Sequence, residues 1–349
     1  MSRFSGWGTL VRWTIAAGMI LLGARMASAA VWYVSPWGSD LASGQALNEA
    51  FRTLQYAVDR SGAGDVIYAD QGTYNLGYAT GYPETSPVAV RGALNKAVEL
   101  ESLFGAETTI IEGAPNAEVN KCGPNAMRGV YLGSGARLRG FTVRNGHTSD
   151  TPGDMRFDSG GGIYAMDGSY IYDCVIEECS ALFAGGGAYG GEYNRCRFVR
   201  NSNIQGGMGV GGGVSSARLY HCQIVSNDVV GASLFSNFGA HGGGASYSTL
   251  YNCYVEGNRV LNGLGGGLYQ CTAYNGVILN NDVDMLNPDD VSPYRGYGGG
   301  VYGGQMFNCT IALNTTTKEG GGVAGVTNGV NCVIVDNLAP WGNNNCLQS

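Results

Sequence analysis

Charged residues are scarce in this sequence. They make up 13% of the 349 residues, where about 25% is usual, whereas apolar residues remain at 44%. A strongly charged, disordered chain is therefore excluded, and a packed core is expected. The 20 Lys and Arg residues are outnumbered by 27 Asp and Glu, which gives a net charge of −7. Such a chain lacks the basic field that a nucleic-acid backbone requires, so we expect no nucleic-acid partner.

Long apolar runs are absent after the first thirty residues. The run Thr14–Ala24 follows Arg3 and Arg12 and precedes Ala27–Ala29, which has the small-x-small pattern of a signal-peptidase site. Because a membrane span needs about 18 to 20 apolar residues, this segment predicts a signal peptide over residues 1–29. We expect an exported chain, secreted, periplasmic or at the cell surface, with no membrane span after cleavage.

Glycine, in contrast, is abundant, with 59 residues or 17%, against about 7% on average. This content excludes a mainly helical protein. Three consecutive glycines would start by chance at about 0.005 of positions, fewer than two in the chain. Seven triplets occur, at intervals of 22 to 33 residues, starting at Gly160, Gly185, Gly211, Gly242, Gly265, Gly298 and Gly320. The spacing predicts an internal repeat over residues 160–349.

Two further positions recur with the triplets. Most triplets are followed after eleven residues by a cysteine and five residues later by an asparagine, with Cys179 at the asparagine position of the first repeat. The cysteines are Cys174, Cys196, Cys222, Cys253, Cys309 and Cys332, and the asparagines are Asn201, Asn227, Asn258, Asn281, Asn314 and Asn337. An apolar residue stands two positions after each cysteine, so the pair shares one face of a strand.

Each repeat has room for two or three strands of four to five residues and none for a helix. Because such a coil cannot bury its apolar face alone, the coils must stack, each adding strands to parallel sheets about 4.8 Å from the last. We therefore predict an all-β fold, a right-handed single-stranded parallel β-helix, with the usual hand of parallel crossovers. Like positions then form columns along the axis.

The columns have structural interpretations. Asparagine amides can hydrogen-bond from one coil to the next at a tight bend, where Asn tolerates left-handed backbone angles. The glycine triplets allow positive φ at another corner and a close approach of coils. Neighbouring thiols in a ladder point the same way, so we expect a buried row of reduced cysteines. No Cys-x-x-Cys or Cys/His spacing indicates a metal site.

The repeats resemble those of a known family. Phe198–Asn201 and its analogues, alternating with Gly-Gly-Gly-Ile-Tyr segments, are similar to the repeats of chlamydial polymorphic outer-membrane proteins. The opening segments Trp32–Asp40, Phe51–Gln55 and Gly64–Tyr68 resemble the pectin-lyase-like right-handed β-helix superfamily. The resemblance implies a fold that polysaccharide lyases, glycoside hydrolases and adhesins share.

Both ends of a β-helix need cover, because an open end exposes strand edges. Asn48 can cap a helix that carries Phe51, Leu54 and Val58 on one face and plugs the N-terminal end. After Asn337 no cap is visible, so we expect a partner over that end or a longer protein. The expected organisation is a signal peptide (1–29), a cap with the first strands (30–75) and the β-helix (76–349).

The segments between repeats vary in length. Three are long, residues 146–159, 228–241 and 282–297, and they build a binding face or are tolerated surface insertions. The third gathers four carboxylates, those of Asp282, Asp284, Asp289 and Asp290. Oxygen ligands of this kind suit Ca²⁺, but the order of an EF-hand is missing. A calcium site and a solvated acidic loop both stay open.

If the cysteines point inward, the residues next to them along the chain point outward and form a polar patch. The patch consists of Asp173, Glu177, Arg195, Arg197 and His221. These groups could serve a lyase or a hydrolase, but alternating charges also pair across an exposed sheet. A column of aromatic residues also has two interpretations, because such rings stack on sugars or pack against each other. The column contains Tyr172, Tyr220, Tyr251, Tyr274 and Phe307.

Recognisable catalytic motifs of the resembling enzymes are missing. The only lysines are Lys96, Lys121 and Lys318, so lyases with a lysine base have no evident counterpart here. We therefore expect a noncatalytic β-helix that binds a glycan or another surface, as an adhesin does. The alternative is a polysaccharide lyase or glycoside hydrolase acting on acidic polysaccharide, and a structural spacer is a third possibility.

Overall fold

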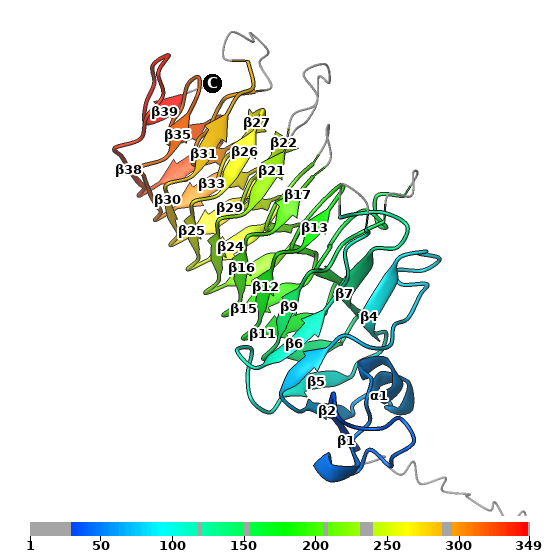
Figure 1. The fold of residues 1–349 in the computed structure, drawn as a ribbon. Coiled ribbons are helices and arrows are strands. Elements are labelled where there is room, and N and C mark those ends of the chain that lie inside the picture. The colour runs from blue at the N-terminus through cyan, green and yellow to red at the C-terminus, as the bar shows by residue number, and fades with distance from the viewer. Residues whose placement is uncertain are drawn as a thin grey trace, which may run out of the picture.

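The structure is a computed structural model that describes residues 29–117, 121–149, 154–204, 209–230, 240–287 and 295–347. Over these residues the chain winds into a right-handed parallel β-helix with one α-helix at its N-terminal end (Figure 1). The predicted fold class and the capping helix are confirmed. The expected signal peptide lies outside the described residues, except for Ala29. None of the described helices is long and apolar enough to cross a membrane.

Six successive coils each contribute one short strand to four sheets, which the chain meets in the order C, A, B and D. Strands within a sheet come from neighbouring coils and pair in parallel, so that residues at equivalent positions of the repeat lie opposite each other. The sequence predicted two or three strands of four to five residues per coil, which is wrong. The repeat strands are two or three residues long, and therefore four of them fit into one coil.

The sheets are defined by the following strands. Sheet A contains β1 (Val31–Val34), β2 (Val66–Ala69), β5 (Glu99–Ser102), β8 (Arg137–Arg139), β11 (Tyr170–Tyr172), β15 (Glu192–Asn194), β19 (Arg218–Tyr220), β24 (Thr249–Tyr251), β29 (Thr272–Tyr274), β33 (Gln305–Phe307) and β37 (Asn328–Val330). Sheet B contains β3 (Gly72–Tyr74), β6 (Thr109–Glu112), β9 (Thr142–Arg144), β12 (Val175–Glu177), β16 (Arg197–Val199), β20 (Gln223–Val225), β25 (Tyr254–Glu256), β30 (Val277–Leu279), β34 (Thr310–Ala312) and β38 (Val333–Val335).

Sheet C contains β4 (Ala89–Leu94), β7 (Met127–Leu132), β10 (Ile163–Ala165), β14 (Ala188–Tyr189), β18 (Val214–Ser215), β23 (Ala245–Ser246), β28 (Leu268–Tyr269), β32 (Val301–Tyr302), β36 (Val323–Ala324) and β39 (Cys346–Leu347). Sheet D contains β13 (Ser180–Ala181), β17 (Ser202–Asn203), β21 (Asp228–Val230), β26 (Arg259–Leu261), β31 (Asp282–Asp284) and β35 (Thr315–Thr316). A further pair, β22 (Ala240–His241) and β27 (Gly263–Leu264), packs beside sheet D.

One apolar core runs along the axis from the cap into the last coils. Because side chains alternate along a strand, the middle residue of each three-residue strand in sheets A and B points inward. Tyr193 and Phe198 illustrate this arrangement, since both are fully buried and their rings meet edge to face at 5.1 Å. A smaller core of Val229, Val260 and Val283 lies under sheet D. The periodic apolar pattern of the sequence thus becomes a continuous interior.

Two tight turns recur in every coil, and a residue with positive φ makes each of them. Between sheets A and B these residues have φ between 53° and 55°, and they are Asp173, Arg195, His221, Asn252, Asn275, Asn308 and Asn331. Between sheets B and D they include Glu178, Arg200, Ser226, Gly257, Asn280 and Leu313. The expectation that the repeated asparagines themselves adopt left-handed angles is wrong. The residue before each of them does so, which leaves the asparagine free to point inward.

The N-terminal end of the core is covered by α1 (Leu54–Arg60) (Figure 1). This helix begins after Thr53, whose hydroxyl accepts a hydrogen bond from the backbone N–H of Tyr56 at 3.3 Å. The prediction that Asn48 caps it is wrong. Asn48 lies in a separate 3₁₀ turn, η1 (Leu47–Glu49), and Phe51, which bridges to β1, separates the two elements. Phe51 is nevertheless buried, at 2% exposure.

Candidate functional site

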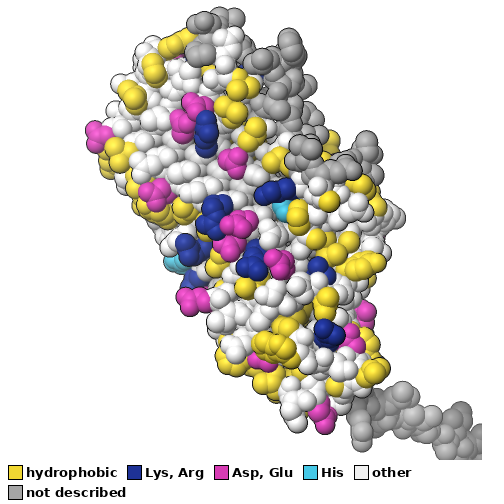
Figure 2. Space-filling view, viewed as in Figure 1, with side chains coloured by type: hydrophobic (Ala, Val, Ile, Leu, Met, Phe, Trp, Pro, Cys, Tyr) yellow, Lys and Arg dark blue, Asp and Glu magenta, His cyan; other side chains and the backbone are white. Residues whose placement is uncertain are grey.

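The predicted polar patch lies at the turn between sheets A and B and on the outer face of sheet B. Asp173, Arg195 and His221 occupy the same turn position in three successive coils. Arg197 and Glu177 lie on neighbouring strands of sheet B with their side chains outward. The structure places these five residues on the outside of three successive coils. Figure 2 shows charged side chains of both signs gathered along the middle of one face.

Ion pairs between coils use most of the charge in this patch. The Arg195 guanidinium donates two hydrogen bonds to the Asp173 carboxylate, at 2.7 and 2.9 Å, and Arg139 approaches the same carboxylate at 3.5 Å. Arg200 contacts Glu177 at 3.0 Å and Glu178 at 2.9 Å. Pairs of this kind stabilise an exposed sheet across its strands. Both oxygens of the Asp173 carboxylate are thereby engaged, which opposes a role as a general base.

His221 and Arg197 remain outside these pairs. Both side chains are exposed and form no hydrogen bond or ion pair with any residue that the structure describes. A general base needs a partner that orients it and a site that excludes water. The patch places these five residues near one another, yet it does not assemble them into a catalytic arrangement.

The same turn position changes character in the later coils. It is filled by Asn252, Asn275, Asn308 and Asn331, whose exposed side-chain amides hydrogen-bond from coil to coil at 3.1, 3.2 and 3.2 Å. The sequence interpretation missed this second asparagine column. Its signal was an asparagine directly before Cys253, Cys309 and Cys332.

The cysteine column lies directly behind this turn. Each thiol donates a weak hydrogen bond to the carbonyl two residues earlier, for example from Cys222 to Tyr220 at 3.3 Å and from Cys253 to Tyr251 at 3.4 Å. All ten cysteines of the chain are free, and eight of them are buried. Burial raises the pKa of the Cys271 thiol to about 12, and it also raises the pKa of the Cys196 thiol. Neutral, buried thiols are packing groups and poor nucleophiles.

The buried asparagine column forms a continuous hydrogen-bonded ladder. Each side-chain amide donates to the side-chain oxygen of the next asparagine, at 2.9 to 3.0 Å from Asn201 to Asn337. The same side-chain oxygen also accepts a hydrogen bond from the backbone N–H of the asparagine one coil earlier, for example from Asn227 to Asn258 at 3.0 Å. Every member is at most 5% exposed. The ladder satisfies a row of polar groups that water cannot reach.

The glycine triplets face this ladder across a narrow interior. A Cβ on the third glycine of a triplet would lie 3.1 Å from the Asn258 amide at Gly244 and 3.0 Å from the Asn281 amide at Gly267. In the first repeat the third glycine, Gly162, instead meets the sulfur of Cys179. The two sequence motifs recur together because they pack against each other, and only the first glycine of each triplet has positive φ.

The acidic segment is only partly described. Asp282 and Asp284 lie in strand β31 of sheet D, so the prediction of a loop from residue 282 is wrong. Arg259 on the neighbouring strand lies between them, with its Nε 3.9 Å from Asp282 and its Nη2 2.5 Å from Asp284. The arginine thus offers both carboxylates a positive charge from the protein itself. Asp289 and Asp290 lie outside the described residues, and no group of three or more metal-ligating side chains occurs within the described ranges.

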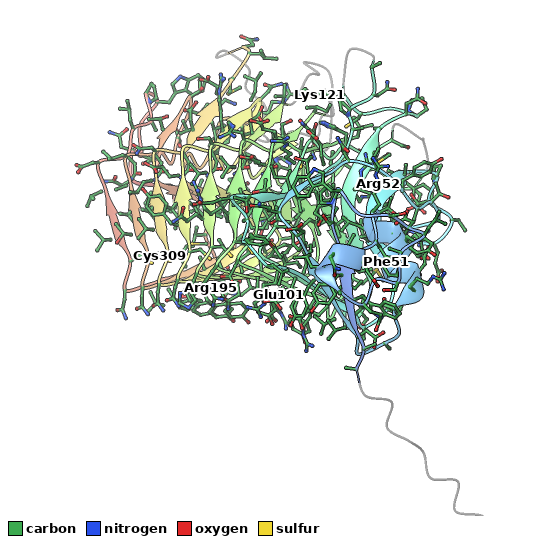
Figure 3. The ribbon with its side chains drawn as sticks, turned by 60° about the horizontal axis from the view of Figure 1, so that its bottom comes forward. Phe51, Arg52, Glu101, Lys121, Arg195 and Cys309 are labelled. Atoms are coloured by element: carbon green, nitrogen blue, oxygen red, sulfur yellow. The ribbon has the colours of Figure 1, made fainter. Side chains whose placement is uncertain are left out.

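The long connections lie away from the polar patch. The first of them follows β9 of sheet B, the other two follow strands of sheet D, and all three lead to sheet C, whereas the patch lies at the turn from sheet A to sheet B. In Figure 3, Arg195 and Glu101 lie along one edge of the molecule and Lys121 lies at the opposite edge. The described parts of these connections therefore do not cover the patch, and no enclosed catalytic cleft is formed there.

The aromatic column lies on the outer face of sheet A. Tyr220, Tyr251, Tyr274 and Phe307 stack in sequence, with ring centroids 4.9 to 5.0 Å apart and planes within 9° of parallel. The ring faces that point along the stack between Tyr220 and Phe307 are thus covered by neighbouring rings. A sugar needs a free ring face to stack on. The stack therefore acts as packing along the sheet.

A concave region occurs where sheet C turns into sheet A. This groove has a volume of about 430 Å³ and spans four successive coils. Its lining residues are Asp167, Gly168, Tyr170, Gly191, Glu192, Ser216, Ala217, Arg218, Tyr247 and Thr249. The volume falls within the usual range of small-ligand sites. The sequence interpretation missed the groove because its lining comes from turns of different length in four repeats.

Comparisons with known proteins identify the fold. No protein-family model and no curated protein sequence matches this chain. A rhamnogalacturonan lyase structure matches 82% of this chain and 74% of its own length, with 15% identity and a TM-score of 0.50. A structure of pectate lyase Pel9A matches 89% of this chain and 78% of its own, with 13% identity and a TM-score of 0.40. Pectin methylesterase PemA from Erwinia chrysanthemi matches 92% and 94%, with 11% identity and a TM-score of 0.39. At these identities the similarity concerns the parallel β-helix fold.

Proposed function

We propose that this chain is an exported, noncatalytic β-helix that binds polysaccharide along the outer face of sheet A. The carrying observation is the groove between sheets C and A, which continues onto this face and is lined mainly by polar side chains. Sheet A has eleven strands in register, so its outward side chains repeat at rung intervals along the axis. An extended polymer is the ligand shape that such a surface fits.

The absence of catalysis is supported by the state of the polar patch. Asp173 is held by two arginines, and the described connections leave the patch open to solvent. Buried thiols with raised pKa supply no nucleophile. Export is supported by the signal-peptide pattern over residues 1–29. An adhesin-like role at a cell surface is supported by the likeness of the repeats to those of chlamydial polymorphic outer-membrane proteins.

The test measures binding and catalysis on the same samples. The purified chain is incubated with insoluble and soluble polysaccharides, both neutral and acidic, and bound protein is measured by co-sedimentation and affinity electrophoresis. Reducing ends and ultraviolet-absorbing unsaturated ends are measured in parallel. We expect binding without release of product. Release of either product would overturn the noncatalytic function, and failure to bind any polysaccharide would overturn the binding function.

A glycoside hydrolase is the second candidate, because two carboxylates, those of Asp167 and Glu192, line the groove. Hydrolases use a pair of carboxyl groups on either side of the scissile bond. In this case reducing ends would appear, and both Asp167→Asn and Glu192→Gln would abolish their release. A lyase would instead release unsaturated ends from acidic polymers.

A further inference from the structure

The groove between sheets C and A owes its shape to unequal turns. In the first repeat coil four residues, Met166–Ser169, connect the two sheets, whereas the next coils use only two. This longer turn forms one wall, and Tyr247, three coils further on, forms the other. Small residues, Gly191 and Ala217, form the floor. Because the groove spans three spacings between neighbouring coils, its length is about 14 Å.

Three charged side chains of the groove are not engaged in hydrogen bonds or ion pairs among the described residues. The side chains of Asp167, Glu192 and Arg218 form no hydrogen bond and no ion pair with any described residue. Three arginines on or beside sheets A and B do contact a carboxylate, namely Arg139, Arg144 and Arg195. Glu192 and Arg218 are direct neighbours in sheet A and remain unpaired. The groove thus keeps two acceptors and one donor available.

Tyr247 occupies a position that is unfavourable for its side chain. The corner residue directly after each sheet C strand from β14 to β36 has positive φ, and in the other coils of this range it is Gly190, Ser216, Gln270, Gly303 or Gly325. Tyr247 adopts φ of 48° there, although a bulky side chain disfavours this region. The residue is 53% exposed, and its ring meets the Tyr269 ring in a T-shaped contact, at a centroid distance of 5.5 Å and an angle of 87°. Unlike the rings of the column on sheet A, the Tyr247 ring has no parallel stacking partner among the described residues.

We propose that this groove binds a neutral sugar unit of the polysaccharide, which stacks on Tyr247 and bonds to Glu192, Asp167 and Arg218 through its hydroxyl groups. The inference rests on the proposed function and specifies its site and ligand class. Carboxylates accept hydrogen bonds from sugar hydroxyls, and the guanidinium donates to sugar oxygens. A free aromatic face covers the apolar side of a sugar ring.

The charge of the groove disfavours acidic sugars. Two carboxylates against one guanidinium leave the lining negative, and the whole chain carries a net charge of −7. A uronate would bring a further negative charge next to Glu192 or Asp167, where like charges repel. The binding face therefore selects neutral over acidic polymers.

The experiment compares two groove variants with two matched controls. Tyr247→Asn removes the ring but keeps a residue that tolerates positive φ, and Gln270→Asn makes the same exchange at the corner one coil beyond the groove. Glu192→Gln removes one acceptor charge, and Glu107→Gln removes an exposed carboxylate elsewhere. Binding of neutral gluco-, manno- and galacto-oligosaccharides and of tetragalacturonate is measured by isothermal titration calorimetry, and folding is measured by thermal unfolding.

We expect the wild-type chain to bind a neutral oligosaccharide and not tetragalacturonate. Tyr247→Asn and Glu192→Gln should each raise the Kd at least tenfold, with Tm unchanged or higher, and the controls should bind normally. If the chain binds polysaccharide but the groove variants bind as well as wild type, or if it prefers tetragalacturonate, this inference is overturned and the proposed function stands. If the wild-type chain binds no glycan, both are overturned.

Discussion

Two asparagine columns run along this β-helix, and they differ in what surrounds them. The buried column, Asn201 to Asn337, keeps the same residue type through six coils. The exposed column at the turn from sheet A to sheet B begins as Asp173, Arg195 and His221 and becomes asparagine only from Asn252 onward. Both columns hydrogen-bond from coil to coil. The difference teaches that burial enforces repetition, because a buried polar group has no water to replace a lost partner.

The largest effect should follow from interrupting the buried column. Asn258→Ala removes the acceptor of the Asn227 backbone N–H at 3.0 Å and the donor to the Ile224 carbonyl at 2.9 Å. We expect a loss of about 2 to 5 kcal/mol in the free energy of unfolding, because these groups remain buried without partners. Urea unfolding followed by circular dichroism measures the loss. A change below about 1 kcal/mol would show that the ladder contributes little.

The buried residue His147 predicts a dependence of stability on pH. Burial lowers the pKa of His147 to about 4, from an ordinary 6.5, and its Nδ1 lies 2.6 Å from the Ser180 hydroxyl. At a pH between about 4 and 6.5, His147 therefore binds a proton in the unfolded chain but not in the folded chain. Stability should be full above pH 6.5 and fall toward pH 4, by about 3 kcal/mol from this group.

The His147→Gln variant should lose that part of the pH dependence, as measured by unfolding at pH 4.5 and pH 7. Equal slopes for wild type and His147→Gln would mean that other groups cause the acid sensitivity.

A methyl group opposite the buried ladder should also destabilise the fold. A Cβ at Gly244 would lie 2.7 Å from the Gly267 carbonyl oxygen and 3.1 Å from the Asn258 amide. Gly244→Ala should cost about 1 to 3 kcal/mol through overpacking. Gly329→Ala is the control, since a Cβ there meets nothing within 4 Å. Thermal unfolding of both variants measures the difference, and equal Tm values would contradict the packing argument.

The smallest effect is expected at the exposed column. Asn275→Gly removes the side-chain amide but keeps a residue that adopts φ of 54°, so stability should change by about 0.5 kcal/mol or less. Asn275→Val should instead cost about 1 to 2 kcal/mol, because a β-branched residue is strained at positive φ. Urea unfolding separates the two. A large loss in Asn275→Gly would show that the exposed ladder itself stabilises the coils.

Much of the fold was predictable because near-identical repeats leave few ways to bury their apolar faces. The triplet spacing, the Cys-x-Ile alternation and the column of asparagines all follow from one coil stacked on the next. Details inside a coil were harder to predict. Strands of two residues carry too little alternation to be recognised, and Thr53 rather than Asn48 caps α1 because Phe51 is committed to an extended bridge with Val34.

The candidate sites were likewise predictable only in part from the sequence. The sequence placed Asp173, Arg195 and His221 on one surface, but it could not show that Arg195 and Arg139 engage the carboxylate of Asp173. Likewise, the acidic character of residues 282–290 was visible, whereas the position of Arg259 between Asp282 and Asp284 was not. Partners on neighbouring coils lie more than twenty residues apart, and which of them meet depends on rotamers and turn lengths.

The amino-acid sequence by itself determined the repeat, the parallel stacking and the identity of the buried columns, because each of these needs only that equivalent positions in adjacent coils meet. The tertiary structure decided where the long connections run, which charges neutralise each other and where the surface becomes concave. The groove with Tyr247, Glu192 and Arg218 belongs to this second group, since it arises from one long turn and three short turns of successive coils that are brought together only when the β-helix has closed.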